Sequence, residues 1–132
     1  MVAYQLPEDC RYTEDDEWIR SDAGQALVGI TDYAQQQLGD IVFVELPEVG
    51  AVFSQGDSFG VIESVKAVAD LRAPISGSVV AVNETLNEHP EAVNQDCYDD
   101  GWLIALAPSD PGELDALMDA AGYRKHVEER SD

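Results

Sequence analysis

Lys66 is the residue whose type and position point most directly to chemistry. The chain has two lysines, Lys66 and Lys125, against 27 aspartates and glutamates. Lys125 stands in a polar C-terminal segment, whereas Lys66 is flanked by valine and alanine. A single amine kept in the most apolar stretch of the chain favours its use as the attachment point of a cofactor. The alternative is a lysine whose stem covers apolar surface while its ammonium group stays in water.

Other catalytic signatures are absent from the sequence. We find no glycine-rich phosphate loop and no serine or cysteine nucleophile in a recognised local frame. His89 and His126 have no ligand spacing around the two cysteines, so no metal site is predicted. Cys10 and Cys97 lie far apart in sequence, and we expect both to be reduced thiols.

The charge of the chain limits its partners and location. The formal net charge is −20, which disfavours binding to nucleic acid or to acidic membranes. No apolar run approaches the roughly 18 residues of a membrane span, and residues 1–10 carry no targeting signal. We therefore expect a cytoplasmic protein with no nucleic-acid or membrane partner. The dispersed acids also suggest a hypothesis of adaptation to high salt, in which dissolved cations screen their repulsion.

Short strands dominate the predicted secondary structure and indicate a mostly β sandwich or barrel. A length of 132 residues predicts one domain, with a core of about residues 12–123 and a polar tail at 124–132. Residues 21–24 are predicted to form a hairpin turn. The predicted strands are Trp18–Arg20, Gln25–Ile30, Ile41–Leu46, Ser58–Ser64, Ala67–Arg72, Ser78–Val82 and Trp102–Ala107.

Helices are predicted at the periphery of this β fold. Thr31 is the expected N-cap of a short helix at Asp32–Leu38, which Gly39 ends. Another helical turn is expected around Pro90–Val93. A C-terminal helix is expected to begin with Asp110 as cap, Pro111 in the first position and Glu113 completing a capping box. Its apolar stripe, predicted to pack on the sheet, consists of Leu114, Leu117, Met118 and Ala121.

The predicted strands on either side of Lys66 place it at the tip of a tight hairpin. A lysine there is exposed, rigidly presented and free of neighbours. An enzyme that must acylate one amine and no other needs these properties. Acylation would replace the positive charge with a neutral amide that carries a flexible arm.

With this hairpin the chain resembles the H-protein family of the glycine cleavage system, whose members are lipoyl carriers. The resemblance covers roughly Tyr12 to Tyr123, and its several ordered matches are more specific than a single motif. The matching segments are 12–13, 17–18, 28–35, 38–47, 59–60, 63–67, 73–77, 82–83, 101–103 and 113–117.

The resemblance implies a fold, a cofactor and a role. The implied fold is a barrel-sandwich hybrid of the lipoyl/biotinyl type, with two small sheets, short peripheral helices and a C-terminal helix. Lipoate would be bound covalently to Lys66. The recognition hairpin around it would consist of Glu63, Ser64, Val65 and Ala67.

The implied role is that of a non-catalytic carrier, which shuttles an aminomethyl intermediate and reducing equivalents between enzymes. Its implied partners are glycine decarboxylase (P protein), aminomethyltransferase (T protein) and dihydrolipoyl dehydrogenase (L protein). A lipoate ligase or lipoyl transferase would attach the cofactor.

The resemblance also implies a cleft that receives the loaded arm. Glu17 and Asp70 align with acids beside that cleft, and Tyr33 falls at another lining position. Carboxylates there could hold an ammonium group by charge-assisted hydrogen bonds. The alternative is ordinary surface acidity, given the 27 acids. Two positions depart from the family pattern: Asp16 replaces a common histidine, and Cys97 follows residues where a proline is frequent.

Other functions remain open on the sequence alone. A biotinyl domain usually has methionines beside its lysine, whereas Val65 and Ala67 flank Lys66 here. A lipoyl domain of a 2-oxoacid dehydrogenase is shorter and continues into a linker and a catalytic core. An enzyme using scattered acids has no positive signal, and an unmodified interaction module would tolerate Lys66→Arg. The alternative to the glycine cleavage role is thus a lipoyl or biotinyl carrier domain of another multienzyme complex.

Overall fold

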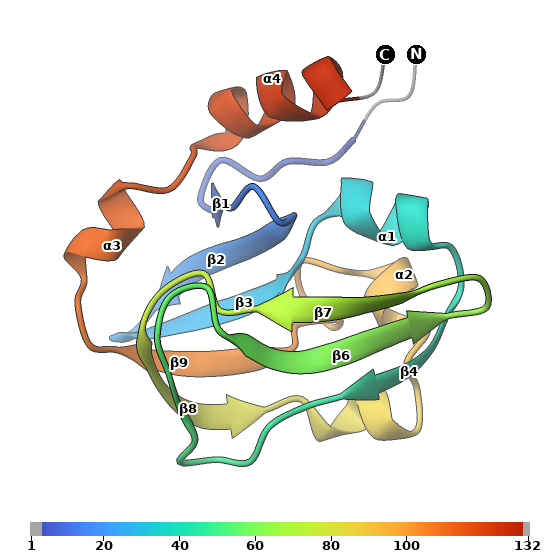
Figure 1. The fold of residues 1–132 in the computed structure, drawn as a ribbon, viewed down its shortest axis with the longest axis horizontal. Coiled ribbons are helices and arrows are strands. Elements are labelled where there is room, and N and C mark those ends of the chain that lie inside the picture. Colours follow the sequence, from blue (N-terminus) through green and yellow to red (C-terminus); the bar gives the residue numbers. More distant parts are fainter. Residues whose placement is uncertain (1–3, 131–132) are drawn as a thin grey trace.

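The computed structural model describes residues 4–130, which form two antiparallel β-sheets with helices at their periphery. Figure 1 shows the smaller sheet in front of the larger one. The larger sheet has the order β1-β2-β3-β9-β8-β5, with β1 Arg11–Tyr12, β2 Glu17–Asp22, β3 Gln25–Ile30, β9 Ile104–Pro108, β8 Gly77–Val82 and β5 Val52–Phe53. The smaller has the order β4-β6-β7, with β4 Ile41–Glu45, β6 Ser58–Ser64 and β7 Val68–Arg72. The mostly β prediction is confirmed.

Every predicted strand is present, and the differences lie at the ends and in short pairings. The strands β1 and β5 were not predicted because two residues carry too little periodicity to be recognised. The predicted β2–β3 hairpin is confirmed. Asp22 pairs with Gln25 around Ala23 and Gly24, which have φ of +52° and +85°. Positive φ at both central residues matches the twist of the flanking strands.

Alternation of side chains along the strands builds the main core between the two sheets. Ile62 and Val44 are cross-strand partners in the smaller sheet, and both are buried. Val28 and Ile104 are partners in the larger sheet, also buried. A second cluster forms around Trp18, whose indole N–H donates to the Cys97 carbonyl at 2.9 Å.

The local signals for the first helix are confirmed. Helix α1 spans Asp32–Leu38, and the Thr31 side chain accepts a hydrogen bond from the Ala34 N–H at 3.1 Å. Gly39 follows with φ of +80° and ψ of −156°, a conformation that is essentially restricted to glycine. The predicted turn near Pro90 is the short helix α2, Ala92–Gln95, preceded by the 3-10 helix η1, Glu84–Asn87.

The prediction of one C-terminal helix starting at Asp110 is wrong. The short helix α3 (Gly112–Asp115) ends early, and Met118 then exchanges both backbone hydrogen bonds with Tyr12. Because that pairing needs extended backbone, the helix cannot continue through Met118. Asp119 restarts it by accepting a hydrogen bond from the Gly122 N–H at 2.8 Å, which begins α4 (Ala120–Arg130).

Some side-chain predictions for this region are confirmed and others are wrong. Asp110 accepts a hydrogen bond from the Gly112 N–H at 3.1 Å, as a cap would. Glu113 does not close a capping box, because its carboxylate accepts from the backbone N–H and the hydroxyl of Ser76 instead. Leu114 and Leu117 pack against the main core, whereas Ala121 is exposed, so the predicted stripe is broken.

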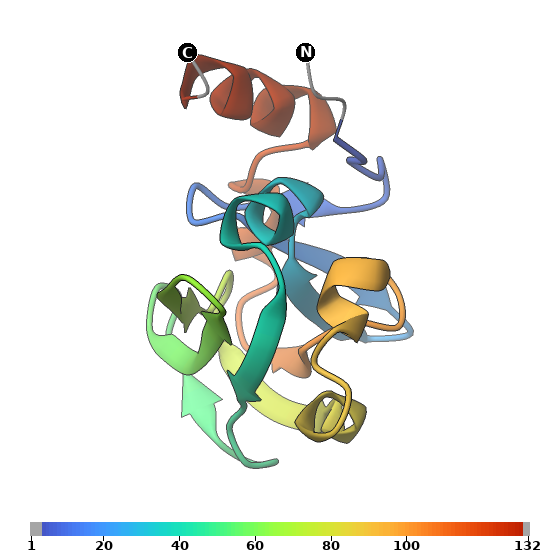
Figure 2. The ribbon, with the colours of Figure 1, turned by 90° about the vertical axis from the view of Figure 1, so that its right-hand side faces the viewer.

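The predicted polar tail is helical as far as Arg130, and its last two residues lie outside the described part of the chain. Val127 is buried within it. Helix α4 lies over β1 and α1 (Figure 1, Figure 2). Asp16 holds it there, accepting a hydrogen bond from the Tyr123 hydroxyl at 2.9 Å and pairing with Arg130. Asp16 thus anchors a helix.

Candidate cofactor-attachment site

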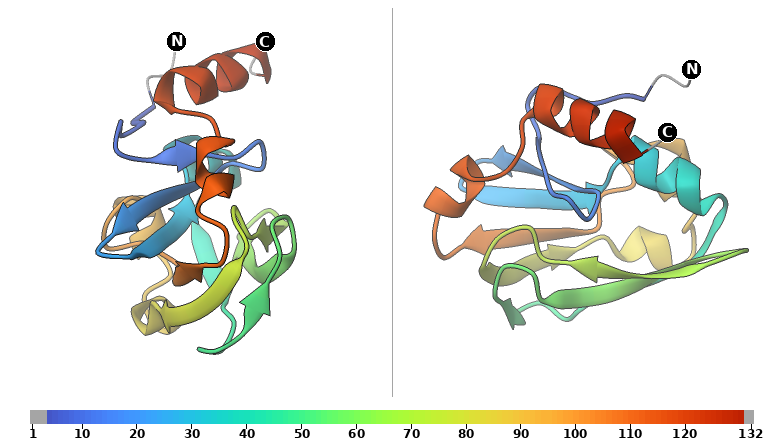
Figure 3. Two further views of the ribbon diagram at one scale, coloured as in Figure 1. Left: turned by 90° about the vertical axis from the view of Figure 1, so that its left-hand side faces the viewer. Right: turned by 45° about the horizontal axis from the view of Figure 1, so that its top comes forward.

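Lys66 lies at the tip of the β6–β7 hairpin, as predicted from its flanking strands. The tip extends beyond α1 and the rest of the small sheet (Figure 3, right). Val65 and Lys66 are both exposed. A hairpin that projects in this way presents its central side chain to another macromolecule without steric interference from its own fold.

The turn that carries Lys66 is held by the side chain of Ser64. The Ser64 hydroxyl accepts hydrogen bonds from the N–H groups of Lys66 and Ala67, at 3.3 and 3.1 Å. The backbone N–H of Ser64 donates to the Ala67 carbonyl at 2.8 Å. Serine is well suited to this position because its short hydroxyl can bond to backbone groups two and three residues ahead.

A second contact ties the hairpin to the rest of the fold. The Val65 N–H donates to the Asp40 carbonyl at 3.1 Å, which links the tip to the segment between α1 and β4. A Cβ at Gly39 would lie 3.7 Å from the Cε of Lys66, so the lysine stem passes beside the end of α1. The sequence contained no signal for either contact.

The Lys66 ammonium group has no acidic partner. Within residues 4–130 the ion pairs shorter than 4.0 Å involve Arg20, Arg72, His89 and Arg130, and none involves Lys66. Exposure without a partner fits an amine that is to be acylated, because no desolvated ion pair must first be broken. Lys66 therefore fits covalent attachment of a carboxylic acid cofactor as an amide.

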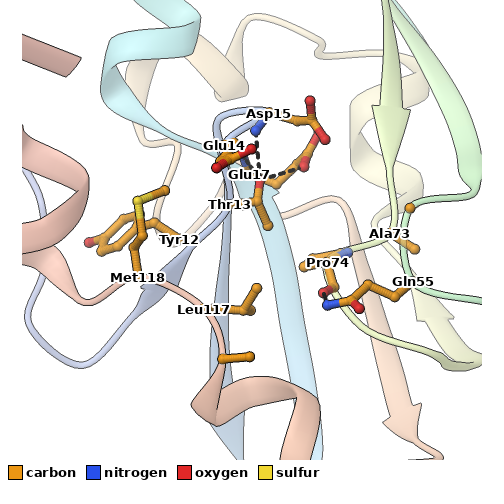
Figure 4. A pocket seen from close by; sticks show the side chains of 12 residues that line it. Tyr12, Thr13, Glu14, Asp15, Glu17, Gln55, Ala73, Pro74, Leu117 and Met118 are labelled. Carbon is orange, nitrogen blue, oxygen red and sulfur yellow. Dashed lines mark hydrogen bonds between the residues drawn. The ribbon is translucent and has the colours of Figure 1, made fainter. Parts of the chain in front are cut away.

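Glu17 lies in a different environment, at an open pocket of about 270 Å³. One wall of the pocket comes from Tyr12, Leu117 and Met118, and the facing wall from Gln55, Ala73 and Pro74 (Figure 4). The Glu17 side chain is only 2% exposed. This pocket lies near the end of β7 that is farther from Lys66.

The Glu17 carboxylate has two hydrogen-bond donors. The Thr13 hydroxyl donates to Oε1 at 2.8 Å, and the Arg72 backbone N–H donates to Oε2 at 3.2 Å. Burial raises the pKa of Glu17 from 4.5 to about 8, and the two hydrogen bonds lower it only in part. A carboxyl group with this pKa binds a proton at neutral pH, and a cation beside it would favour its ionised form.

The other two residues expected at the cleft do not line this pocket. Asp70 is exposed on β7 and pairs with Arg72 at 3.7 Å, and it does not line the pocket. Tyr33, on α1, is 9% exposed. Its ring packs edge-on against Tyr4 at 5.2 Å between centroids, and Arg130 lies 4.9 Å over it. The structure connects Asp70 to Glu17 through Arg72, while Tyr33 belongs to the packing under α4.

Sequence reasoning missed Arg72, which contacts both acids. Its guanidinium also donates to the carbonyl of Gly56, a residue that lines the pocket, at 3.2 Å. The 55-residue separation between Arg72 and Glu17 left no local signal for this contact. The contact of Thr13 with Glu17 had a local signal. Thr13 lies only four residues before Glu17, and both belong to segments that resemble the family.

Comparison with known proteins agrees with this geometry. A family model described as glycine cleavage H-protein matches residues 10–130. The chain belongs to this family. An H protein of the glycine cleavage system from Anaeromyxobacter sp. (strain K) is 56% identical over 126 residues, covering 96% of this chain and 98% of the relative.

Further members of the H-protein family show the same breadth of match. A mitochondrial H protein of Oryza sativa subsp. indica is 55% identical over 119 residues, covering 90% of this chain and 73% of the relative. The crystal structure of an H protein from Mycobacterium marinum superposes with a TM-score of 0.84 at 38% identity, covering 96% of this chain and 100% of that one. The predicted family and the lipoyl-type fold are confirmed.

The other groups considered for chemistry, potential metal ligands and the two thiols, form no reactive site within residues 4–130. Within residues 4–130, no group of three or more potential ligands is placed to hold a metal ion. Cys10 and Cys97 are free and buried, and burial raises the pKa of each thiol to about 12. Thiols with such a pKa are poor nucleophiles. No helix between residues 4 and 130 is long and apolar enough to cross a bilayer.

Proposed function

We propose that this chain is the lipoyl carrier of a glycine cleavage system, with lipoate attached to Lys66. In this role it shuttles an aminomethyl intermediate and reducing equivalents between glycine decarboxylase, aminomethyltransferase and dihydrolipoyl dehydrogenase. A lipoate ligase or lipoyl transferase attaches the cofactor. The chain itself is not an enzyme, and its expected cytoplasmic location remains a prediction.

One observation carries the proposal: Lys66 is exposed, forms no ion pair with the described part of the chain, and lies at the tip of a hairpin that is hydrogen-bonded on both sides. When attached, lipoate supplies a dithiolane that accepts electrons and a one-carbon amine. The chain contributes rigidity at the root of this arm. A rigid root and a flexible arm raise the local concentration of the reactive end near a docked partner.

We further propose that the loaded arm rests along the outer side of β7. Outward side chains of this strand lead away from the hairpin tip, and those from Val68 through Asp70 to Arg72 span roughly 13 Å at 3.3 Å per residue. The Arg72 N–H then contacts Glu17. An ammonium group at the end of the arm would meet Asp70 first and then Glu17, and each can accept a charge-assisted hydrogen bond. Tyr33 would act only indirectly, through the packing between α1 and α4.

Reconstitution tests the carrier function. The chain is lipoylated by a lipoate ligase and mixed with the three partner enzymes, tetrahydrofolate and NAD, and glycine-dependent NADH formation is followed. We expect Lys66→Arg to abolish both the lipoyl adduct, measured by intact mass, and NADH formation. Lys125→Arg is the matched control, because it removes the other lysine of the chain and should change neither. A lipoyl adduct on Lys125, or full activity of Lys66→Arg, would overturn the proposal.

A further inference from the structure

Asp16 has a backbone conformation that few side chains adopt, and it lies directly before Glu17. Its φ is +71°, in the left-handed region. Within residues 4–130, Ala23 in the β2–β3 turn is the only other residue besides glycine with a positive φ. Aspartate tolerates this region better than most residues do, but such a conformation persists only where surrounding contacts hold it. The contacts of Asp16 therefore bear on the residue that follows it.

The turn that contains Asp16 is closed by Thr13 and Glu17. The Asp16 N–H donates to the Thr13 carbonyl at 3.2 Å, and the Thr13 N–H donates to the Glu17 carbonyl at 3.0 Å. The Thr13 hydroxyl accepts from the Glu17 N–H at 3.1 Å and donates to Glu17 Oε1 at 2.8 Å (Figure 4). Asp16 is the left-handed residue of this turn, so its conformation sets where the Glu17 carboxyl group lies.

The Asp16 side chain is bonded to α4. Its Oδ1 atom accepts a hydrogen bond from the Tyr123 hydroxyl at 2.9 Å and pairs with the Arg130 guanidinium, and the side chain is 18% exposed. A hydroxyl has one proton to donate, so Tyr123 accepts from the Thr31 hydroxyl, at 2.7 Å. The Asp16 carbonyl accepts from the Thr31 N–H at 3.0 Å. The left-handed residue is thus held through both its backbone and its side chain.

Helix α4 is also continuous with one wall of the Glu17 pocket. Leu117 and Met118, which line that wall, directly precede α4 in the chain. Met118 and Tyr12 exchange backbone hydrogen bonds of 2.8 and 3.0 Å, and the Tyr12 ring stacks on the Tyr123 ring at 4.8 Å between centroids. The helix therefore bears on the pocket at two places, the wall and the turn that leads into Glu17.

We propose that Asp16 is a positioning residue for Glu17: held by Tyr123 and Arg130 of α4, it fixes the turn that keeps the Glu17 carboxyl group at the pocket and away from water. This role deepens the proposed function, because it rests on Glu17 as the acceptor of a cationic amine. Asp16 does not line the pocket, so it acts through Glu17 and not on the amine. Release of α4 would free the turn and loosen one pocket wall in the same step.

The charges around Glu17 allow an effect of position to be separated from an effect of charge. Besides Asp16, the titratable or charged residues at the pocket or bonded to Glu17 are Tyr12, Glu14, Asp15 and Arg72. The negative charge of Asp16 by itself raises the pKa of Glu17. Removal of Arg130 would leave that charge without its partner, so electrostatics alone would raise the pKa of Glu17 further. Loss of the turn would lower it, because water stabilises the ionised carboxylate.

Titration of Glu17 in the unmodified full-length chain tests the inference. The Glu17 carboxyl carbon is followed by NMR across about pH 5 to 9 in the wild type, Arg130→Gln and Tyr123→Phe. Lys125→Gln is the matched control, because it also removes a positive charge from α4 and Lys125 forms no ion pair within residues 4–130. We expect the midpoint of the Glu17 titration to fall by about one pH unit in the first two variants and to stay unchanged in the control.

The two variants support each other. Arg130 lies near the exposed end of α4, so Arg130→Gln leaves the buried core intact. Tyr123→Phe keeps the ring on Tyr12 and keeps the charges of Asp16 and Arg130, so a lower midpoint there reports position alone. An unchanged or higher midpoint in Arg130→Gln would overturn the inference, because Asp16 would then be only a neighbouring charge. An equal fall in Lys125→Gln would overturn it as well.

The lifetime of the loaded arm gives a second readout. The lipoylated chain is loaded by glycine decarboxylase, and loss of the aminomethyl group is followed by intact mass. We expect loss about tenfold faster in Arg130→Gln than in the wild type, and the wild-type rate in Lys125→Gln. Equal rates in the two variants would overturn the inference. Failure of the wild-type chain to be lipoylated or loaded would instead overturn the proposed function, while the titration of Glu17 would still decide the role of Asp16.

Discussion

The two ends of β7 handle a charge in opposite ways. At the hairpin end, the Lys66 ammonium group is exposed, has no ion pair with any residue from 4 to 130, and is flanked by apolar side chains. At the other end, the Glu17 carboxyl group is almost completely buried and accepts hydrogen bonds from Thr13 and Arg72. One group is accessible to another molecule, and the other is enclosed by the fold.

The difference shows that reactivity and recognition need different environments. An amine that must be acylated has to shed protons and approach a large partner, so exposure serves it. A carboxyl group that must hold a cationic amine gains from burial, because electrostatic attraction is stronger away from water. Burial also has a cost, because it disfavours the charged carboxylate, and the raised pKa of Glu17 expresses that cost.

Glu17→Gln should produce the largest change in stability. Because the folded-state pKa of Glu17 is about 8 and the unfolded value is about 4.5, the folded state binds the extra proton between these pH values. Wild-type stability should therefore fall as pH rises from about 5 to 8, relative to the variant, by roughly 2 to 5 kcal/mol. Urea unfolding of both proteins across this range measures the difference. A pH-independent difference would mean that Glu17 titrates at its ordinary pKa.

Gly39→Ala should have the next largest effect and should act at the hairpin end. The φ and ψ of Gly39 are essentially inaccessible to alanine, so we expect a loss of about 1–3 kcal/mol in the free energy of unfolding. Gly122→Ala, within α4, is the control, because its backbone is helical and its Cβ would approach only the movable Asp119 side chain closely, at 3.2 Å, so its effect should be smaller. Urea unfolding of the two variants provides the comparison. Equal effects would show that the end of α1 beside Lys66 is not conformationally restricted.

Ser64→Ala should have the smallest effect on stability but a local effect on the turn. It removes the hydroxyl that accepts from the N–H groups of Lys66 and Ala67, at a cost of about 1 kcal/mol. Amide hydrogen exchange at these two residues should become faster. Ser58→Ala on the same strand is the control, since its hydroxyl bonds only to the Gly60 carbonyl outside the turn. Unchanged exchange at Lys66 would show that the turn is rigid without Ser64.

Local signals predicted the parts of the fold that depend on neighbouring residues. Thr31 and Gly39 defined both ends of α1, and apolar alternation located the strands on either side of Lys66. The prediction of one C-terminal helix failed because a contact between distant residues interrupts it. Its periodicity continued through Met118, but pairing with Tyr12, more than 100 residues away, replaced the helical backbone there.

In the candidate site, too, features set by neighbouring residues were predictable and features set by distant contacts were not. The exposed position of Lys66 was predictable, because a hairpin tip is a local structure. The setting of Glu17 was not, since its donors, its burial and its pKa depend on Arg72, 55 residues away, and on pocket walls from several segments. Asp70 and Tyr33 were expected to line the arm cleft together with Glu17, and their surroundings also depend on distant segments: Asp70 pairs with Arg72, and Tyr33 packs under Arg130 of α4.

The amino-acid sequence by itself therefore determined the β-rich architecture and the lysine at the hairpin tip, because strand periodicity and turn chemistry operate over a few residues. Only the tertiary structure decided which carboxyl group is buried beside a pocket and which residues of α4 hold the turn before it. Register between strands and the packing of distant segments control both properties, and neither has a signature in a short stretch of sequence.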